Sequence, residues 1–183
     1  MKNKLVLPVM VFLAILVSGC GTNPFAAPTA TAIPTATPLP PTPTATPVPE
    51  CAIGPEPDFS GFESWTKVNP KPIKGHETLT NIYVDELAED IYLSASGETF
   101  PVCAKIVKTH LAGNSDIVTA VTVMVKMPAG YDPEHNDWWW GMYDAEGKTA
   151  EMSGKVPVCI ACHLPAASAD YVFSQKVLEE SQK

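Results

Sequence analysis

The sequence predicts an α+β domain, in which an antiparallel β-sheet packs with a few helices, preceded by a disordered linker rich in proline and threonine. The alternation of apolar and polar residues over 117–127 is typical of a strand with one buried face. Asp85 is a good helix N-cap and precedes a helical pattern. Residues 21–50 contain too few large apolar side chains to offset the entropy of ordering them. We therefore divide the chain into a leader at 1–20, a linker at 21–50 and one small domain at 51–183.

The leader has the layout of a lipoprotein signal peptide. Lys2 and Lys4 precede an apolar run of about 13 residues that ends in Val17-Ser18-Gly19-Cys20. Because small residues directly before a cysteine resemble a lipobox, we expect Cys20 to be the lipidated first residue of the mature protein. A transmembrane anchor is the alternative, but the apolar run is shorter than the roughly 20 residues that span a bilayer. The expected location is extracytoplasmic, on the outer face of the cell membrane or the periplasmic side.

The linker at 21–50 predicts a tether. Frequent proline favours extended polyproline II, which rises about 3.1 Å per residue, so thirty residues could reach on the order of 90 Å. Such a stalk would lift the domain off the membrane or through a cell-wall layer, and its threonines could carry sugars.

Periodicity and turn residues predict the elements of the domain in order. They are a strand ending at 81–84, a helix over 86–94, strands over 100–109, 117–127 and 137–143, turns at 128–133 and 147, and a helix from about 169 to 180 capped by Ser168. Leu87, Ile91 and Tyr92 are expected on one side of the first helix. The strand over 100–109 is expected to place Lys108 on the same face as Ile106.

The charge of the domain limits its partners. Residues 51–183 contain ten Lys, nineteen Asp and Glu and no Arg, which gives a formal charge of about −9. Nucleic acids and anionic lipid headgroups are poor partners for such a surface. A redox partner protein with a basic patch, or a neutral small molecule, suits it better.

The motif that carries chemistry is Cys159-Ile160-Ala161-Cys162-His163, near the end of the sequence. Two thiols at this spacing can each form a thioether to one vinyl group of a haem, and the histidine that follows is then held as an axial ligand of the iron. We therefore expect covalent haem c on Cys159 and Cys162, with His163 on the iron.

Other interpretations of the motif fit less well. Zinc needs four ligands, and the histidines that could complete a site, His76, His110 and His135, have no ligand-like spacing. Small electron-transfer cytochromes c carry the motif early and a methionine ligand downstream, whereas no methionine follows Met152 here. Cytochromes c′ carry the motif late but are four-helix bundles. A strand-rich haem protein whose iron has an open second face remains.

Cysteine counting predicts a disulfide. Of five cysteines, one is assigned to lipid and two to haem, which leaves Cys51 and Cys103. An even pair in an oxidising compartment is expected to form a bond, although two separate thiols are the alternative.

The ordered set of motifs resembles the cytochrome P-460 family, which includes cytochrome c′-β. The resemblance covers most of 60–175 and rests on Ile82-Tyr83-Val84-Asp85, Phe100-Pro101 leading to Ile106-Val107-Lys108, Val123-Met124-Val125-Lys126, Asn136-Asp137-Trp138, Cys159 to His163 and Asp170-Tyr171-Val172-Phe173. It implies a sheet and helices that enclose one five-coordinate c-type haem. It also implies that Lys108 stands where true cytochromes P-460 cross-link a lysine to the porphyrin.

Two departures bear on the activity that the resemblance implies. True cytochromes P-460 oxidise hydroxylamine, in part with nitric oxide, whereas cytochromes c′-β lack the cross-link and bind nitric oxide behind apolar side chains. Cys103 replaces the usual glycine after Phe-Pro, and Thr80 stands near the place of an arginine found in hydroxylamine-oxidising members. The open alternatives are therefore a hydroxylamine-oxidising enzyme, a non-enzymatic nitric oxide binder or scavenger, and a simple electron-transfer cytochrome. Relatives are often homodimers.

The walls of the haem pocket are expected to come from large side chains on the strands. Alternating tryptophans usually pack a pocket wall and a core rather than conduct electrons. Methionine sulfur near aromatic rings is likewise more often packing than an iron ligand. The side chains expected to pack the pocket are Trp138, Trp140, Phe100 and Met124.

Overall fold

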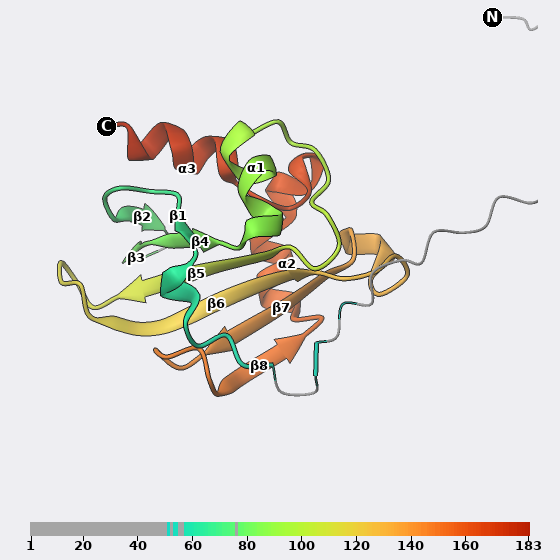
Figure 1. Ribbon diagram of the computed structural model, residues 1–183, viewed down its shortest axis with the longest axis horizontal. Helices are drawn as coiled ribbons and strands as arrows, with labels where there is room; N and C mark the ends of the chain where they lie inside the picture. The colour runs from blue at the N-terminus through green and yellow to red at the C-terminus, as the bar shows by residue number, and fades with distance from the viewer. Residues whose placement is uncertain (1–50, 52, 55–56, 76) are drawn as a thin grey trace, which may run out of the picture. The chain divides into compact units, whose positions relative to one another are not determined.

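A computed structural model describes residues 51, 53–54, 57–75 and 77–183, whose elements are shown in Figure 1. The predicted lipid anchor at Cys20 and the predicted tether at 21–50 lie outside the described residues. In the described part, eight strands form one antiparallel sheet and three α-helices accompany it, which confirms the α+β prediction. Within those residues, no helix has both the length and the apolar character that crossing a bilayer requires.

Six strands form the main path of the sheet, in the order β1-β4-β5-β6-β7-β8. Their bounds are Thr66–Lys67 for β1, Ile82–Val84 for β4, Lys105–Leu111 for β5, Val118–Lys126 for β6, Trp138–Tyr143 for β7 and Ala150–Gly154 for β8. Strands β2 (Ile73–Gly75) and β3 (Thr78–Thr80) pair with each other, and β3 joins the sheet through β5. The register sets Lys108 opposite Thr122, and Met124 opposite Trp140.

The two faces of the sheet carry different hydrophobic clusters. Helix α2 (Pro157–His163) lies behind the sheet in Figure 1, while the segment before β1 crosses its front. Side chains alternate between the faces of a strand, so neighbouring residues enter different clusters. The cluster that packs with the helices includes Ile106, Met124, Trp138 and Trp140, and the front cluster includes Phe59, Val107, Val123 and Trp139.

The first helix, α1 (Glu86–Ser94), begins where the sequence predicts. The Asp85 side chain accepts a hydrogen bond from the Ala88 backbone N–H at 3.1 Å, which is the expected N-cap. The predicted inward side was partly wrong, because Leu87 is 48% exposed. The buried face is centred on Ala88 and Tyr92, about one residue further round the helix.

Two predicted boundaries are corrected by backbone conformation. Strand β5 begins at Lys105 rather than at residue 100, because Cys103 has a left-handed φ of 74° that interrupts an extended chain. The last helix, α3 (Ser174–Ser181), begins later than the predicted 169. The chain first passes through a 3₁₀ helix, Leu164–Ala169, and then through Asp170 and Tyr171, whose φ values of 51° and 63° cannot continue a right-handed helix.

A buried ion pair holds this last turn against the sheet. Lys126 at the end of β6 lies 2.7 and 2.8 Å from the two carboxylate oxygens of Asp170, and the two residues are only 5% and 3% exposed. The carboxylate also accepts the Phe100 backbone N–H at 2.8 Å and the Asn136 side-chain N–H at 3.0 Å. Its lone pairs are therefore well satisfied, as a buried charge requires.

Removing one member of this pair should be costly. Lys126→Met leaves the Asp170 carboxylate buried without its counter-charge, so we expect the free energy of unfolding in urea to fall by about 3–5 kcal/mol. The matched control is Lys105→Met, which breaks the more exposed pair with Asp85 at 3.1 Å and should cost less than about 1 kcal/mol. Equal losses in the two variants would contradict the expectation.

Candidate functional site

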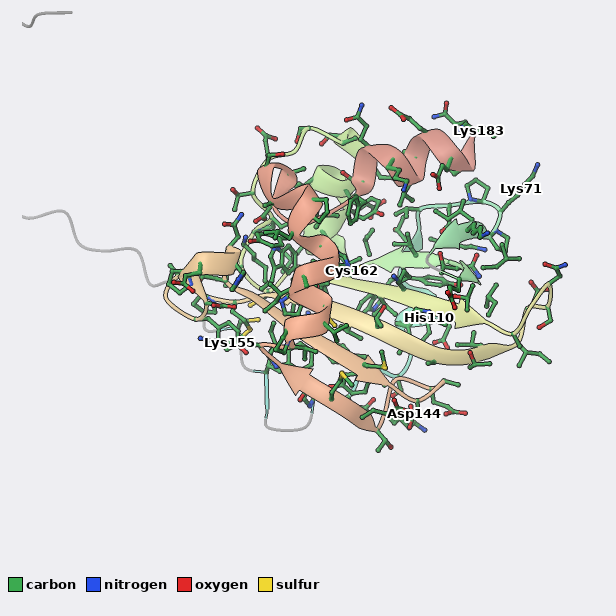
Figure 2. The ribbon with its side chains drawn as sticks, turned by 180° about the vertical axis from the view of Figure 1, so that it is seen from behind. Lys71, His110, Asp144, Lys155, Cys162 and Lys183 are labelled. Carbon is green, nitrogen blue, oxygen red and sulfur yellow. The ribbon has the colours of Figure 1, made fainter. Side chains whose placement is uncertain are left out.

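Helix α2 presents the C-x-x-C-H motif to the sheet. Pro157 occupies the first turn of this helix, where its missing N–H costs no hydrogen bond. Cys159 is half-buried and packs against the cluster on the helix side of the sheet, whereas Cys162 is exposed. Figure 2, seen from behind, shows Cys162 on α2 in front of the sheet and His110 further along the strands.

The imidazole of His163 is oriented by a backbone carbonyl. Its Nδ1 lies 2.7 Å from the carbonyl oxygen of Tyr171. Because a carbonyl can only accept, Nδ1 carries the proton and Nε2 carries the lone pair that binds a metal. The ring packs against Trp140 and Phe173, with centroid distances of 4.8 and 5.5 Å. The side chain is therefore fixed in the tautomer that an axial iron ligand needs.

A cavity of about 580 Å³ opens beside α2, between the helices and the sheet. Its volume is within the range of roughly 300–1,000 Å³ that small-molecule and cofactor sites occupy. Cys159, Cys162 and His163 all line it. Most of the remaining wall is apolar and includes Ile73, Ile82, Tyr92, Ile106, Met124, Trp140, Met142, Val172, Phe173 and Val177.

The residues of this cavity fit a haem. Trp140, which is 1% exposed, lines the cavity, and within the described residues its indole N–H has no hydrogen-bond partner. That nitrogen is not accessible from the cavity, so the fit to a haem depends on the donor set and on the apolar wall. An apolar cavity with two thiols and an oriented imidazole on its wall has the donor set for a c-type haem.

The structure gives the zinc interpretation no support. Among the described residues, no group of three or more His, Cys, Asp or Glu side chains gathers so as to hold a metal ion. His110 lies on β5 and His135 in a 3₁₀ turn, Pro133–His135, where it contacts Asp132 at 3.0 Å. His76 lies outside the described residues.

Lys108 lies on the cavity wall near the motif, on the face predicted from the alternation of β5. Burial lowers the pKa of its ammonium, and the negative charges of the Cys162 and Cys159 thiolates oppose that effect. In the described part of the chain no carboxylate forms an ion pair with it. A lowered pKa increases the share of neutral, nucleophilic amine, and thioether formation would remove the opposing thiolates.

The predicted packing residues divide between the cavity and its surroundings. Met124 and Trp140 line the cavity, whereas Trp138 and Phe100 lie in the same cluster behind that wall, with their rings 5.6 Å apart. Trp138 is directed away by a hydrogen bond from its indole N–H to the Asp170 carbonyl at 2.8 Å. Alternation gave the face of each side chain, but not its distance from the motif.

Several cavity residues were not predicted as part of the site. His110 is two residues after Lys108 on the same strand face, and its ring nitrogens contact the hydroxyls of Thr78 and Thr122, both at 3.3 Å. The period of two on β5 was the signal that could have found it. Glu180 of α3 also lines the cavity and is the carboxylate among the described lining residues. No sequence pattern pointed to it, because α3 packs there through tertiary structure alone.

Cys51 and Cys103 lie together, as separate thiols whose side chains are hydrogen-bonded. Burial, followed by the hydrogen bond and the negative charge of Cys103, raises the pKa of Cys51 to about 12. Cys103 has a left-handed φ of 74°, at the position where the family resemblance implies a glycine. A non-glycine residue in this conformation carries backbone strain. The disulfide stays a prediction.

Comparison with known proteins identifies one family. The family model for cytochrome P-460 matches residues 59–174, which is more than half of the chain and includes the sheet, the C-x-x-C-H motif and most of the residues that line the cavity. No curated protein sequence matches the chain significantly.

The disulfide can be tested by mass. After denaturation and alkylation without reductant, we expect Cys51 and Cys103 to escape modification and to be linked in a single cross-linked peptide. With reductant before alkylation, both should be modified. Cys51→Ser is the control, because it should leave Cys103 alkylated in both conditions. Full alkylation of Cys51 and Cys103 in unreduced wild-type protein would contradict the bond.

Proposed function

Because the chain belongs to the cytochrome P-460 family, and is thus a haem-binding cytochrome of a kind that acts on nitrogen compounds, we propose that it carries one covalent haem c and binds or oxidises a small nitrogen ligand. Cys159 and Cys162 would form the thioethers, and His163 would be the proximal ligand. The observation that carries this proposal is the convergence of both thiols and the oriented imidazole on one apolar cavity.

The protein's contribution is ligation, orientation and exclusion of water. When bound, the haem supplies the redox centre and the coordination position for the nitrogen ligand. His163 would hold the iron, while Met124, Met142 and Ile106 make the cavity wall apolar. Such a wall suits neutral ligands of the size of hydroxylamine or nitric oxide.

Lys108 is the proposed site of an additional bond between the protein and the porphyrin. Joining the amine nitrogen to a porphyrin carbon removes two electrons and two protons, so this step would need a two-electron oxidant such as a peroxide. Its place on the cavity wall and the lowered pKa of its amine support a nucleophilic role. Proton transfer during hydroxylamine oxidation would need an acceptor, such as a carboxylate near the bound ligand. Glu180 and His110 are the groups on the cavity wall that could take this part.

Two other functions remain as alternatives. A nitric oxide binder would use the same cavity without turnover, and its apolar wall is compatible with that role. A simple electron carrier would need a second strong ligand on the iron. Met124 and Met142 both line the cavity, so a thioether from the sheet is the ligand to consider.

We also propose where the protein works and what it meets there. A lipid anchor at Cys20 and the tether at 21–50 would hold the domain outside the cytoplasm. The acidic composition of 51–183 favours a redox partner with a basic patch over nucleic acid. A homodimer is part of the proposal only through the resemblance to relatives.

The three functions give different results in one assay. Purified ferric protein is mixed with hydroxylamine and a dye acceptor, and dye reduction and the optical spectrum are recorded together. We expect dye reduction from a high-spin resting iron. A stable nitrosyl spectrum after nitric oxide is added to a separate sample, with no dye reduction by hydroxylamine, would instead identify a binder. A low-spin six-coordinate spectrum at rest would contradict both and leave the electron carrier.

The attachment of the haem can be tested residue by residue. In acid-denatured wild-type protein the haem mass should stay with the polypeptide, and Cys159→Ala with Cys162→Ala should release it. If Lys108 is cross-linked, the reduced wild-type protein should have a red-shifted Soret band, and Lys108→Met should abolish that band while keeping the thioethers. Lys74→Met, at another lysine of the cavity wall, is the matched control and should leave that band unchanged. A wild-type spectrum in Lys108→Met would exclude the cross-link.

A further inference from the structure

We propose that Lys126 and Asp170 position the axial histidine, because they hold the turn whose carbonyl orients the His163 ring. This inference rests on the proposed ligation of haem iron by His163. Neither residue lines the cavity, so both would act through the backbone between Asp170 and Tyr171.

The turn that contacts His163 is conformationally strained. Asp170 and Tyr171 are consecutive non-glycine residues in the left-handed region, with φ values of 51° and 63°. Such residues persist only where surrounding interactions determine their conformation. The interactions that do so here converge on Asp170, and the next carbonyl along the chain, that of Tyr171, is the one that accepts the Nδ1 proton of His163.

Asp170 is held from several separate segments. Its carboxylate accepts from Lys126 of β6, Phe100 of the loop before β5 and Asn136 of the loop before β7. Its carbonyl accepts from the Trp138 indole of β7 at 2.8 Å. The side chain and the main chain of one residue are thus both fixed to the sheet, and the Tyr171 carbonyl has little freedom to move.

A second connection runs along β7. Trp138, which donates to Asp170, lies two residues before Trp140, whose ring packs against His163. The Lys126 ammonium lies 5.0 Å from the Trp138 ring. The hydrogen-bond acceptor of His163 and the aromatic side of its ring are therefore held by neighbouring parts of the same network.

This network should govern the electronic character of the axial ligand. An Nδ1–H that donates to a fixed acceptor makes the imidazole a stronger donor through Nε2 and sets its rotation about the metal–nitrogen bond. A stronger axial donor favours the oxidised metal. If the turn loosens, the bond between iron and His163 weakens and the reduction potential rises.

The test uses the full-length haem protein and two readouts other than activity, the Fe(II)–histidine stretching band in resonance Raman spectra and the midpoint potential. Asp170→Asn removes the counter-charge of Lys126, and Trp138→Phe keeps an aromatic ring but removes the donor to the Asp170 carbonyl. In both variants we expect the band to shift to lower frequency and to broaden, and the potential to rise, with the larger change in Asp170→Asn.

Two controls separate positioning from loss of stability. Trp139→Phe makes the same change on the opposite face of β7, and Val121→Ala removes buried volume from the front cluster. Both should leave the band and the potential at wild-type values. If Asp170→Asn fails to fold, the band and the potential of Trp138→Phe alone test the positioning role.

The outcomes also distinguish this proposal from the function on which it rests. A wild-type histidine band that disappears in His163→Ala establishes the axial ligand. If that band is present and neither Asp170→Asn nor Trp138→Phe moves it, the positioning role is wrong. If wild-type protein has no band that depends on His163, the proposed ligation is itself wrong.

Discussion

The buried ion pair between Lys126 and Asp170 is the constraint on which the architecture of this domain depends. A buried ion pair adds little to the free energy of unfolding compared with apolar residues of the same volume. Removing only one of its two members, however, strongly destabilises the fold. Here the carboxylate is surrounded by donors from the end of β6, the loop before β5 and the loop before β7. The Asp170 carboxylate thereby joins segments that are distant in sequence. It does so beside the turn that follows helix α2, which carries the C-x-x-C-H motif. Apolar residues could fill the same space, but they would not fix the direction of a carbonyl.

The sequence predicted the elements better than their ends. Alternation over 117–127 and the cap at Asp85 reflect local physical chemistry, and strand β6 and helix α1 form there. The start of α3 depends instead on Asp170, which leaves the helical region to reach Lys126, 44 positions earlier in the chain. A helical pattern from 169 onward contains no sign of that partner, since long-range pairing overrides local preference. The short strands β1, β2 and β3 were likewise outside the reach of periodicity, because two or three residues show none.

The sequence also predicts part of the candidate site. The motif named the thiols and the imidazole, and the period of two placed Lys108 on the correct face of β5. What orients the imidazole is a main-chain oxygen, that of Tyr171, and a carbonyl has no signature in the sequence. Trp138 and Trp140 share a face, yet only the second reaches the cavity, because the first is bound to Asp170. Position on a face is a local property, whereas distance from a site is a global one.

The exposure of Cys162 has a consequence for the route by which electrons leave. Cys159 is half-buried against the core, but Cys162, which lines the same cavity, is exposed. A macrocycle attached as proposed would have one covalent link at the molecular surface while its iron stays inside the apolar cavity. An acceptor that docks beside α2 would then approach the conjugated system through the thioether at Cys162. Electrons would then leave through the thioether on this short helix, whereas ligands would bind in the cavity beside it.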